Sequence, residues 1–243
     1  MIVTRFAPSP TGFLHLGHAY AALTAFEASR SHGGRFLLRI EDIDRTRCRP
    51  EFEAAILEDL TWLGLAWEKP VRRQSDHFDD YAKALAALHA RGVLYPCFCT
   101  RKEIADEIAR ADAAPHGPEG PLYPGTCRAL DGAERARRIA EGATYALRLD
   151  VGKAMAEIGG GMTFEERGQG PSGEIGLQHA LPSLLGDVVV ARKELPASYH
   201  LAVVVDDALQ GATLVTRGND LFAATHIQCL LQALLDQIGR AHV

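Results

Sequence analysis

Two histidines near the start of the chain have the type and spacing to act on phosphate groups. His15 and His18 enclose Gly17 in a His-x-Gly-His element that follows a turn rich in proline and glycine, residues 8–12. Imidazoles can donate hydrogen bonds to phosphate oxygens as negative charge develops in a transition state, and glycine allows close approach of a ligand to the backbone. A turn with two incidental surface histidines explains the four residues equally well. The surrounding sequence therefore has to distinguish a phosphate site from such a turn.

Charged side chains that can hold a small zwitterion are spread along the chain. Glu41, Asp42 and Asp44 follow an apolar segment, while Arg5 precedes the proline turn and Arg217 follows another apolar segment. A carboxylate can bind a ligand ammonium, and a guanidinium offers two parallel donors to a carboxylate. A solvated strand end or a cation site is the alternative for the three acids, and a surface salt bridge is the alternative for Arg217.

Three of the five cysteines lie close together in the sequence and have a spacing that can bind metal. Cys97 and Cys99 form a Cys-x-Cys pair, and Cys127 follows after Tyr123 in a Tyr-x3-Cys pattern. Three thiolates and a fourth ligand can hold zinc in a tetrahedron, and an odd cysteine count argues against a disulfide framework in a cytosolic chain. Three reduced, buried cysteines are the alternative. His116 is the ordinary chemical candidate for the fourth ligand.

The elements around these residues predict an α/β fold. A strand at 2–7, a helix at 17–31 and a strand at 35–41 form a β-α-β unit, which places a ligand site at the carboxyl ends of parallel strands. Further helices are predicted at 51–63, 76–91, 132–139 and 220–235, and further strands at 144–149, 187–192 and 212–216. Residues 201–207 are too uniformly apolar for periodicity to distinguish helix from strand. The glycines of residues 159–176 predict a loop-rich region.

The domain organisation follows from these elements and from one change in composition. Residues 93–128 hold three cysteines and a proline- and glycine-rich stretch, so we expect a metal-binding insertion there. Residues 1–92 then form the first half of a nucleotide-binding domain. Residues 129–237 form the rest of the insertion and the second half of that domain, and residues 238–243 are a separate tail.

Several segments together resemble the class I aminoacyl-tRNA synthetases. Residues 5–18 (RFAPSPTGFLHLGH) resemble the family's HIGH signature in the form typical of its glutamyl branch. Residues 39–44 (RIEDID), 201–207 (LAVVVDD) and 216–221 (TRGNDL) resemble three further elements in the same order. The resemblance covers residues 2–237. It implies a Rossmann-like parallel-sheet catalytic domain with a small zinc-binding insertion.

The resemblance also implies roles for individual residues. Glutamate would be bound by Arg5, Ala7, Ser9, Glu41, Tyr199 and Arg217. ATP, with Mg²⁺, would be bound by Pro8, Thr11, Gly12, His15, Gly17 and His18, of which the two histidines are catalytic. One structural zinc ion would be held by Cys97, Cys99, Tyr123 and Cys127, with His116 as the alternative to the tyrosine. On this basis Arg217→Ala is expected to abolish glutamate activation and to leave the fold intact.

Local sequence favours the glutamyl-queuosine branch of the family over the ordinary glutamyl-tRNA synthetases. Ile43 replaces the usual threonine, His200 follows Tyr199 where the ordinary enzymes have YNFA, and 217–221 read RGNDL where they have RGDDH. The branch activates glutamate with ATP without tRNA and transfers it to queuosine in the anticodon loop of tRNA(Asp). The alternatives are a catalytic fragment of an ordinary glutamyl-tRNA synthetase and a non-catalytic remnant that binds nucleotide or RNA.

The end of the chain departs from the family pattern. The KMSKS-type loop expected after the 220–235 helix is absent. Residues 238–243 read IGRAHV, which is the translation of ATC GGA AGA GCA CAC GTC, one reading frame of a common sequencing adapter in which a TGA stop comes next. We therefore expect residues 238–243 to be adapter-encoded, the natural protein to continue, and the chain as written to be inactive or severely impaired.

Composition excludes several classes of protein and indicates where this one is located. The 243 residues carry 26 basic and 31 acidic side chains, a net charge of −5, which argues against a nonspecific nucleic-acid coat protein. No apolar run approaches the roughly 20 residues that span a bilayer, and no signal peptide opens the chain. We expect a cytoplasmic monomer without membrane contact. A set of arginines either faces RNA or lies on a solvated surface: Arg45, Arg47, Arg49, Arg72 and Arg73.

Overall fold

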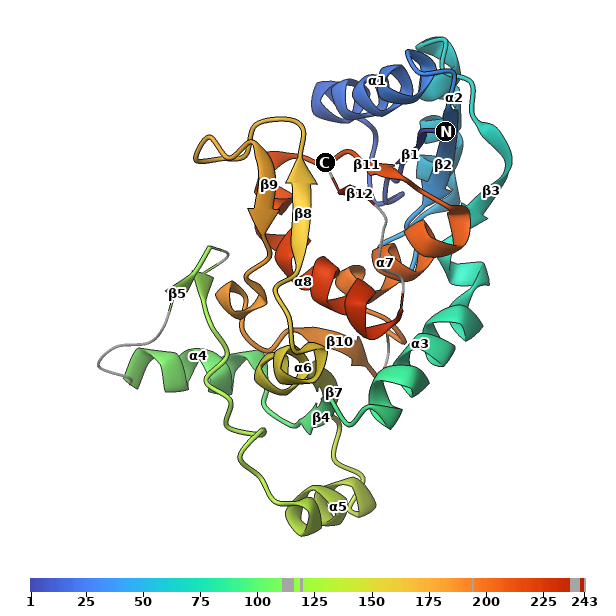
Figure 1. Cartoon of the computed structure of the whole chain (residues 1–243). Helices are drawn as coiled ribbons and strands as arrows, with labels where there is room; N and C mark the ends of the chain where they lie inside the picture. The colour runs from blue at the N-terminus through green and yellow to red at the C-terminus, as the bar shows by residue number, and fades with distance from the viewer. Residues whose placement is uncertain (111–115, 119, 194, 237–240, 243) are drawn as a thin grey trace.

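The computed structural model describes residues 1–110, 116–118, 120–193, 195–236 and 241–242. The chain opens with a parallel sheet in the order β1-β2-β3, and one helix precedes each later strand (Figure 1). These elements are β1 (Val3–Phe6), α1 (Leu16–Arg30), β2 (Arg35–Ile40), α2 (Pro50–Trp62) and β3 (Glu68–Arg73). The predicted β-α-β unit and the α/β fold class are confirmed.

Apolar side chains of both helices cover this sheet. Ala22 and Ala25 of α1 and Ile56 of α2 are completely buried against Leu38 and Ile40 of β2. The central strand of a parallel sheet is buried on both faces, which explains why its sequence is a nearly continuous apolar run.

A helical layer continues the core on the other side of the molecule. It is built by α3 (Phe78–Ala90), α6 (Val151–Ile158), α7 (Tyr199–Gln210) and α8 (Phe222–Leu234), and η1 (Gln74–Asp76) precedes α3. The undecided stretch 201–207 is helical within α7, and all seven of its residues are buried. A helix that is buried on every side has no polar face, so its sequence shows no 3.6-residue period. The Oγ of Ser198 caps its first turn, and Gly211 ends it at φ 70°.

An antiparallel sheet joins distant parts of the chain. Its strands, in the order β10-β7-β4, are β10 (Val189–Arg192), β7 (Ala146–Leu149) and β4 (Leu94–Cys97). The predicted insertion therefore begins in a strand that pairs with residues much later in the chain. The domain limits 1–92, 93–128 and 129–237 stay predictions. The remaining elements near it are α4 (Arg101–Arg110), β5 (His116–Gly117), β6 (Gly120–Pro121), α5 (Gly132–Ala140) and η2 (Pro182–Leu184).

The region predicted to be loop-rich contains a β-hairpin, so that prediction is wrong in part. β8 (Thr163–Glu166) and β9 (Gly176–His179) pair in antiparallel fashion and lie beside α8 (Figure 1). The ring of Phe164 contacts the rings of Phe222 and His226 at centroid distances of 5.9 and 5.4 Å. The strands are short and glycine-flanked, and their stability comes from packing on α8, which local sequence does not report.

The last strands lie next to the first one. β11 (Leu214–Val215) precedes η3 (Asn219–Leu221) and pairs in parallel with β12 (Ala241–His242). The backbone N–H of Thr213 donates to the carbonyl of Val3 at 2.9 Å. Of the predicted tail 238–243, residues 238–240 and 243 lie outside the described residues. Within the described residues, none of the helices has the length and apolar content that a membrane crossing needs.

Candidate functional site

A cavity of about 330 Å³ lies where β1 and β2 end, against α1, α7 and the loop that precedes α8. It brings together six of the residues predicted for ligand binding: Arg5, Ala7, Gly17, Glu41, Tyr199 and Arg217. The other predicted residues, Pro8, Ser9, Thr11, Gly12, His15 and His18, do not line this cavity. The carboxyl end of a parallel sheet is the expected place for a ligand in this architecture.

Arg5 is held in place by a buried acid of α7. Its Nε donates to Oδ1 of Asp207 at 2.9 Å, and its Nη1 donates to the carbonyl of Thr216 at 3.2 Å. Burial alone raises the pKa of the Asp207 carboxyl, but Arg5 and Arg39 outweigh it and lower the pKa to about 2. Asp207 therefore stays ionised and fixes Arg5, a role that its motif by itself did not reveal.

Glu41 is the acid of the cavity. Its Oε1 accepts a hydrogen bond from Nη2 of Arg39 at 3.1 Å, and Nη1 of the same arginine donates to Asp207 at 2.6 Å. Arg39 is completely buried. Burial raises the pKa of Glu41 above its usual range, although Arg39 and Arg5 oppose this. A cationic ligand group beside Glu41 restores its ionised form, so the residue is suited to an ammonium.

Arg217 makes a buried ion pair, not the surface salt bridge that was the alternative. Its Nη2 donates to Oε2 of Glu166 at 2.5 Å, and its Nε donates to Oγ1 of Thr225 at 2.8 Å. The guanidinium carbon lies 4.7 Å from the ring centre of Phe222. Sequence reasoning missed Glu166 because it lies on β8, in the region expected to be loop-rich.

Tyr199 is the first residue of α7 and lines the cavity. Burial and the nearby Glu41 raise the pKa of its phenol to about 12. The hydroxyl is therefore neutral at pH 7 and can donate a hydrogen bond to a ligand carboxylate.

The His-x-Gly-His element forms the amino end of α1. Nδ1 of His15 accepts from the N–H of Gly17 at 3.1 Å, and Nδ1 of His18 accepts from the N–H of His15 at 3.3 Å. Partial burial and the neighbouring His15 lower the pKa of His18. With Nδ1 accepting, a neutral ring carries its proton on Nε2, so each ring can offer one donor beyond the helix end. A Cβ at Gly17 would lie 3.0 Å from Cε1 of His15, so a side chain there would crowd that ring.

A second cavity of about 580 Å³ adjoins the first and shares Glu41 and Tyr199 with it. Ser9, predicted for glutamate binding, lines this larger space. Its other polar lining residues come from several elements: Asp44, Gln74, Tyr123, Arg148, Asp187, Arg192, Ser198 and His200. The shared residues make the two spaces neighbours at one site.

Arg72 and Arg73, from the set of arginines considered for RNA, pair with acids on other elements. Arg72 donates to Asp206 at 2.7 Å and to Asp80 at 2.8 Å, and Arg73 donates to Glu53 at 2.8 Å. These pairs join β3 to α2, α3 and α7, so both arginines have structural roles.

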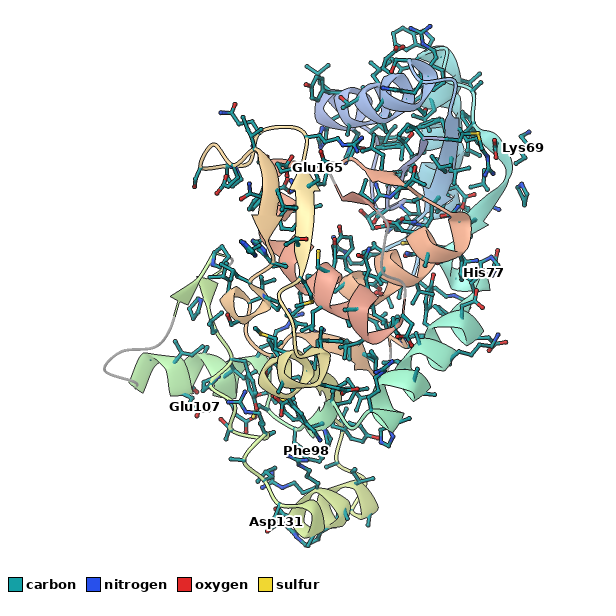
Figure 2. The ribbon with its side chains drawn as sticks, viewed as in Figure 1. Lys69, His77, Phe98, Glu107, Asp131 and Glu165 are labelled. Carbon is teal, nitrogen blue, oxygen red and sulfur yellow. The ribbon has the colours of Figure 1, made fainter. Side chains whose placement is uncertain are left out.

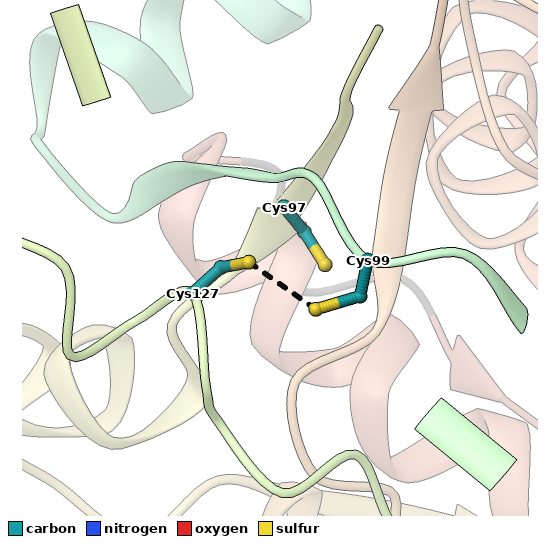
Figure 3. Close-up of side chains that lie close together, drawn as sticks. All are labelled: Cys97, Cys99 and Cys127. Atoms are coloured by element: carbon teal, nitrogen blue, oxygen red, sulfur yellow. Dashed lines mark hydrogen bonds between the residues drawn. The ribbon is translucent and has the colours of Figure 1, made fainter. Parts of the chain in front are cut away.

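The three predicted cysteine ligands meet in space (Figure 3). The sulfur atoms of Cys97, Cys99 and Cys127 all lie within 4.8 Å of one another. The hydroxyl oxygen of Tyr123 lies 3.4 Å from the sulfur of Cys97 and 3.7 Å from that of Cys99. This compact, largely buried set of three sulfurs and one oxygen fits a closed, four-coordinate zinc site. The side chain of His116, the alternative ligand, lies outside the described residues.

Comparison with known proteins agrees with this geometry. The family model for the tRNA synthetases class I (E and Q), catalytic domain, matches residues 1–241. The chain belongs to this family. The glutamyl-Q tRNA(Asp) synthetase of Rhodobacter capsulatus is 50% identical to it over 96% of the chain and 82% of that protein. The synthetase of the same name from Symbiobacterium thermophilum is 45% identical over 97% of the chain and 71% of that protein.

A solved structure of the same family has the same fold. A glutamate tRNA ligase from Elizabethkingia meningosepticum, crystallised in complex with its amino acid, aligns with a TM-score of 0.80 and 25% identity. The alignment covers all of this chain and 48% of that ligase, so the chain spans about half the length of this structural relative.

Proposed function

We propose that the protein activates L-glutamate with ATP, without a requirement for tRNA, and transfers the glutamate to queuosine in the anticodon loop of tRNA(Asp). The observation that carries the proposal is the charge pattern of the smaller cavity. Two arginines and one carboxylate line it, and glutamate presents two carboxylates and one ammonium. The names of the relatives, glutamyl-Q tRNA(Asp) synthetases, support queuosine in tRNA(Asp) as the acceptor of the glutamate.

Each charge of glutamate has a partner in this assignment. Arg5 and Tyr199 bind the side-chain carboxylate, Arg217 binds the α-carboxylate, and Glu41 binds the ammonium. Glutamine would leave one buried guanidinium without its carboxylate, and aspartate is one methylene too short to reach both arginines. Unpaired buried donors give strong discrimination, so selectivity follows from the same contacts.

The amino end of α1 is the proposed phosphate site. The α-carboxylate attacks the α-phosphorus of ATP in line, forming a carboxyl–phosphate bond while the bond to pyrophosphate breaks. The products are glutamyl-adenylate and pyrophosphate. The Nε2–H donors of His15 and His18 and the positive end of the helix dipole stabilise the phosphate charge. Mg²⁺ accompanies ATP and neutralises its phosphates.

The larger cavity is the proposed side of approach for the acceptor. It adjoins the glutamate site at Glu41 and Tyr199, and its volume of about 580 Å³ falls in the range of small-molecule pockets. A hydroxyl of the modified base would attack the activated carbonyl from this side. The bond to AMP then breaks, AMP leaves, and the hydroxyl proton is released to solvent.

Zinc is proposed to have a structural role. Cys97, Cys99, Cys127 and Tyr123 would hold it, joining the end of β4 to the segment 123–127. With four protein ligands the site has no open position for a substrate, which favours structure over catalysis.

An ordinary glutamyl-tRNA synthetase activity is the second candidate. The structural relative is a glutamate tRNA ligase whose fold this chain shares. The glutamate cavity suits both enzymes, so only the acceptor distinguishes them.

The experiment measures two reactions of the full gene product. Glutamate-dependent exchange of pyrophosphate into ATP is followed without tRNA, and glutamylation is then compared on tRNA(Asp) with and without queuosine and on tRNA(Glu). The proposal expects exchange without tRNA and transfer only to queuosine-containing tRNA(Asp). Transfer to tRNA(Glu) identifies the second candidate instead. If the protein binds ATP but exchanges no pyrophosphate in any mixture, it is instead a non-catalytic remnant that binds nucleotide or RNA.

A further inference from the structure

The β8–β9 hairpin brings to the site a buried carboxylate that belongs to none of the recognised sequence elements. Glu166, the last residue of β8, is only 3% exposed. Its Oε2 accepts from Nη2 of Arg217 at 2.5 Å, and its Oε1 accepts from the N–H of Gly168 at 3.1 Å. Both carboxylate oxygens are therefore engaged, and Glu166 itself is absent from the lining of the glutamate cavity.

These contacts determine how the guanidinium of Arg217 is turned. The group is planar with five N–H donors in fixed directions. Its Nε is fixed by Thr225, its Nη2 by Glu166, and one face lies over the ring of Phe222. Among the described residues Nη1 has no hydrogen-bond partner, and Arg217 lines the cavity. The edge that carries Nη1 is thus the one available to a ligand carboxylate.

The same design occurs at the other arginine of the cavity. Arg5 is backed by Asp207 of α7, as Arg217 is backed by Glu166 of β8. An uncompensated charge is costly to bury, so each arginine needs a nearby acid. A carboxylate from a separate element also fixes the arginine before the ligand arrives, which reduces the ordering cost of binding.

Contacts other than this ion pair join the hairpin and the residues after it to α8. Phe164 packs on Phe222 and His226 of α8, and the N–H of Leu181 donates to Nδ1 of His226 at 3.2 Å. A change confined to the Glu166 carboxylate therefore leaves these other contacts of the hairpin in place.

We propose that Glu166 is a positioning residue that orients Arg217 toward the α-carboxylate of the amino acid and so makes the site selective for ligands that carry this group. The inference rests on the proposed function, in which Arg217 binds that carboxylate. Glu166 acts through Arg217 and does not touch the substrate.

The test compares two ligands on matched variants of the protein. Isothermal titration calorimetry measures the Kd of L-glutamate and of 4-amino-5-hydroxypentanoate, in which a hydroxymethyl group replaces the α-carboxylate. The test variant is Glu166→Gln. The control is Glu165→Gln, because Glu165 is an exposed neighbour on β8 that pairs with Arg167 at 3.1 Å (Figure 2).

The preference for glutamate over the alcohol is the diagnostic quantity. We expect it to fall about tenfold or more in Glu166→Gln, because a hydrogen bond to a charged group is lost or misdirected. The affinity for the alcohol should stay within about twofold, and Glu165→Gln should match the wild type. A purely structural role would weaken both ligands together.

A second variant, Glu166→Asp, tests the same inference if Glu166→Gln does not fold. Glu166→Asp keeps the charge but withdraws it by one methylene, so it should also lower the preference, by about threefold or more. An unchanged preference in a folded Glu166 variant overturns the inference alone. A wild-type protein that does not bind glutamate at all overturns the proposed function, and the inference with it.

Discussion

Replacing Asp207 by asparagine removes one negative charge from between two arginines. Asp207 is 4% exposed, and its carboxylate lies 2.9 Å from Nε of Arg5 and 2.6 Å from Nη1 of Arg39. An amide is nearly the same size as a carboxylate, so the change removes charge with little loss of packing. Its effect therefore isolates the electrostatic part of this contact.

The magnitude follows from the pKa. Burial raises the pKa of Asp207, but Arg5 and Arg39 prevail and lower it from the ordinary 3.8 to about 2. At about 1.4 kcal/mol for each pKa unit, the folded state favours the ionised carboxylate by about 2 kcal/mol. Two buried arginines also lose a partner, an effect that reaches about 3 kcal/mol or more when a buried pair is broken. We expect the free energy of unfolding at pH 7 to fall by about 2 to 4 kcal/mol.

The sign of the pH dependence is fixed by the same values. Because the folded pKa lies below the unfolded one, the stabilisation is complete above about pH 4 and is lost as the pH falls toward about 2. The assay is urea unfolding followed by circular dichroism at several pH values between 7 and 2.5. Glu58→Gln, at an exposed position of α2, is the control and should match the wild type within about 0.5 kcal/mol.

Two results would refute this reasoning. A loss below about 0.5 kcal/mol at pH 7 would mean that the buried charge cluster does not stabilise the fold. A loss that stays constant between pH 4 and pH 2.5 would mean that the Asp207 charge is not its source.

Arg217→Ala should abolish glutamate-dependent pyrophosphate exchange by the full gene product. Contrary to the expectation from sequence, the same substitution should also lower the free energy of unfolding in urea by about 3 kcal/mol, because Glu166 stays buried without its cation. The double variant with Glu166→Gln should recover the stability but not the pyrophosphate exchange. Cys127→Ser should lower the Tm and should lose one equivalent of zinc, as measured by plasma mass spectrometry. If Tyr123→Phe keeps full zinc affinity, the tyrosine is not a zinc ligand. Burial lowers the pKa of His200 to about 4, so stability should fall as the pH drops from about 6.5 to 4. Thermal melts of His200→Gln should lack that part of the pH dependence.

Six of the residues that the sequence predicted for ligand binding line one cavity. Arg5, Glu41 and Arg217 lie far apart in the sequence, yet the parallel β-α-β topology brings the ends of β1 and β2 to one edge of the sheet. The three cysteines likewise meet as their spacing predicted. The strands and their order follow from local pattern and topology, whereas the choice of these site residues came from the resemblance to the family.

Sequence by itself determined the kinds of charge that the site carries and the strand ends that present them. Only the tertiary structure decided which acids hold the arginines in place. Glu166 reaches Arg217 through a hairpin that forms by packing on α8, and Asp207 reaches Arg5 from a helix buried on every side. Ion pairs between elements depend on the positions of whole helices and strands, and that information lies in no local stretch of sequence.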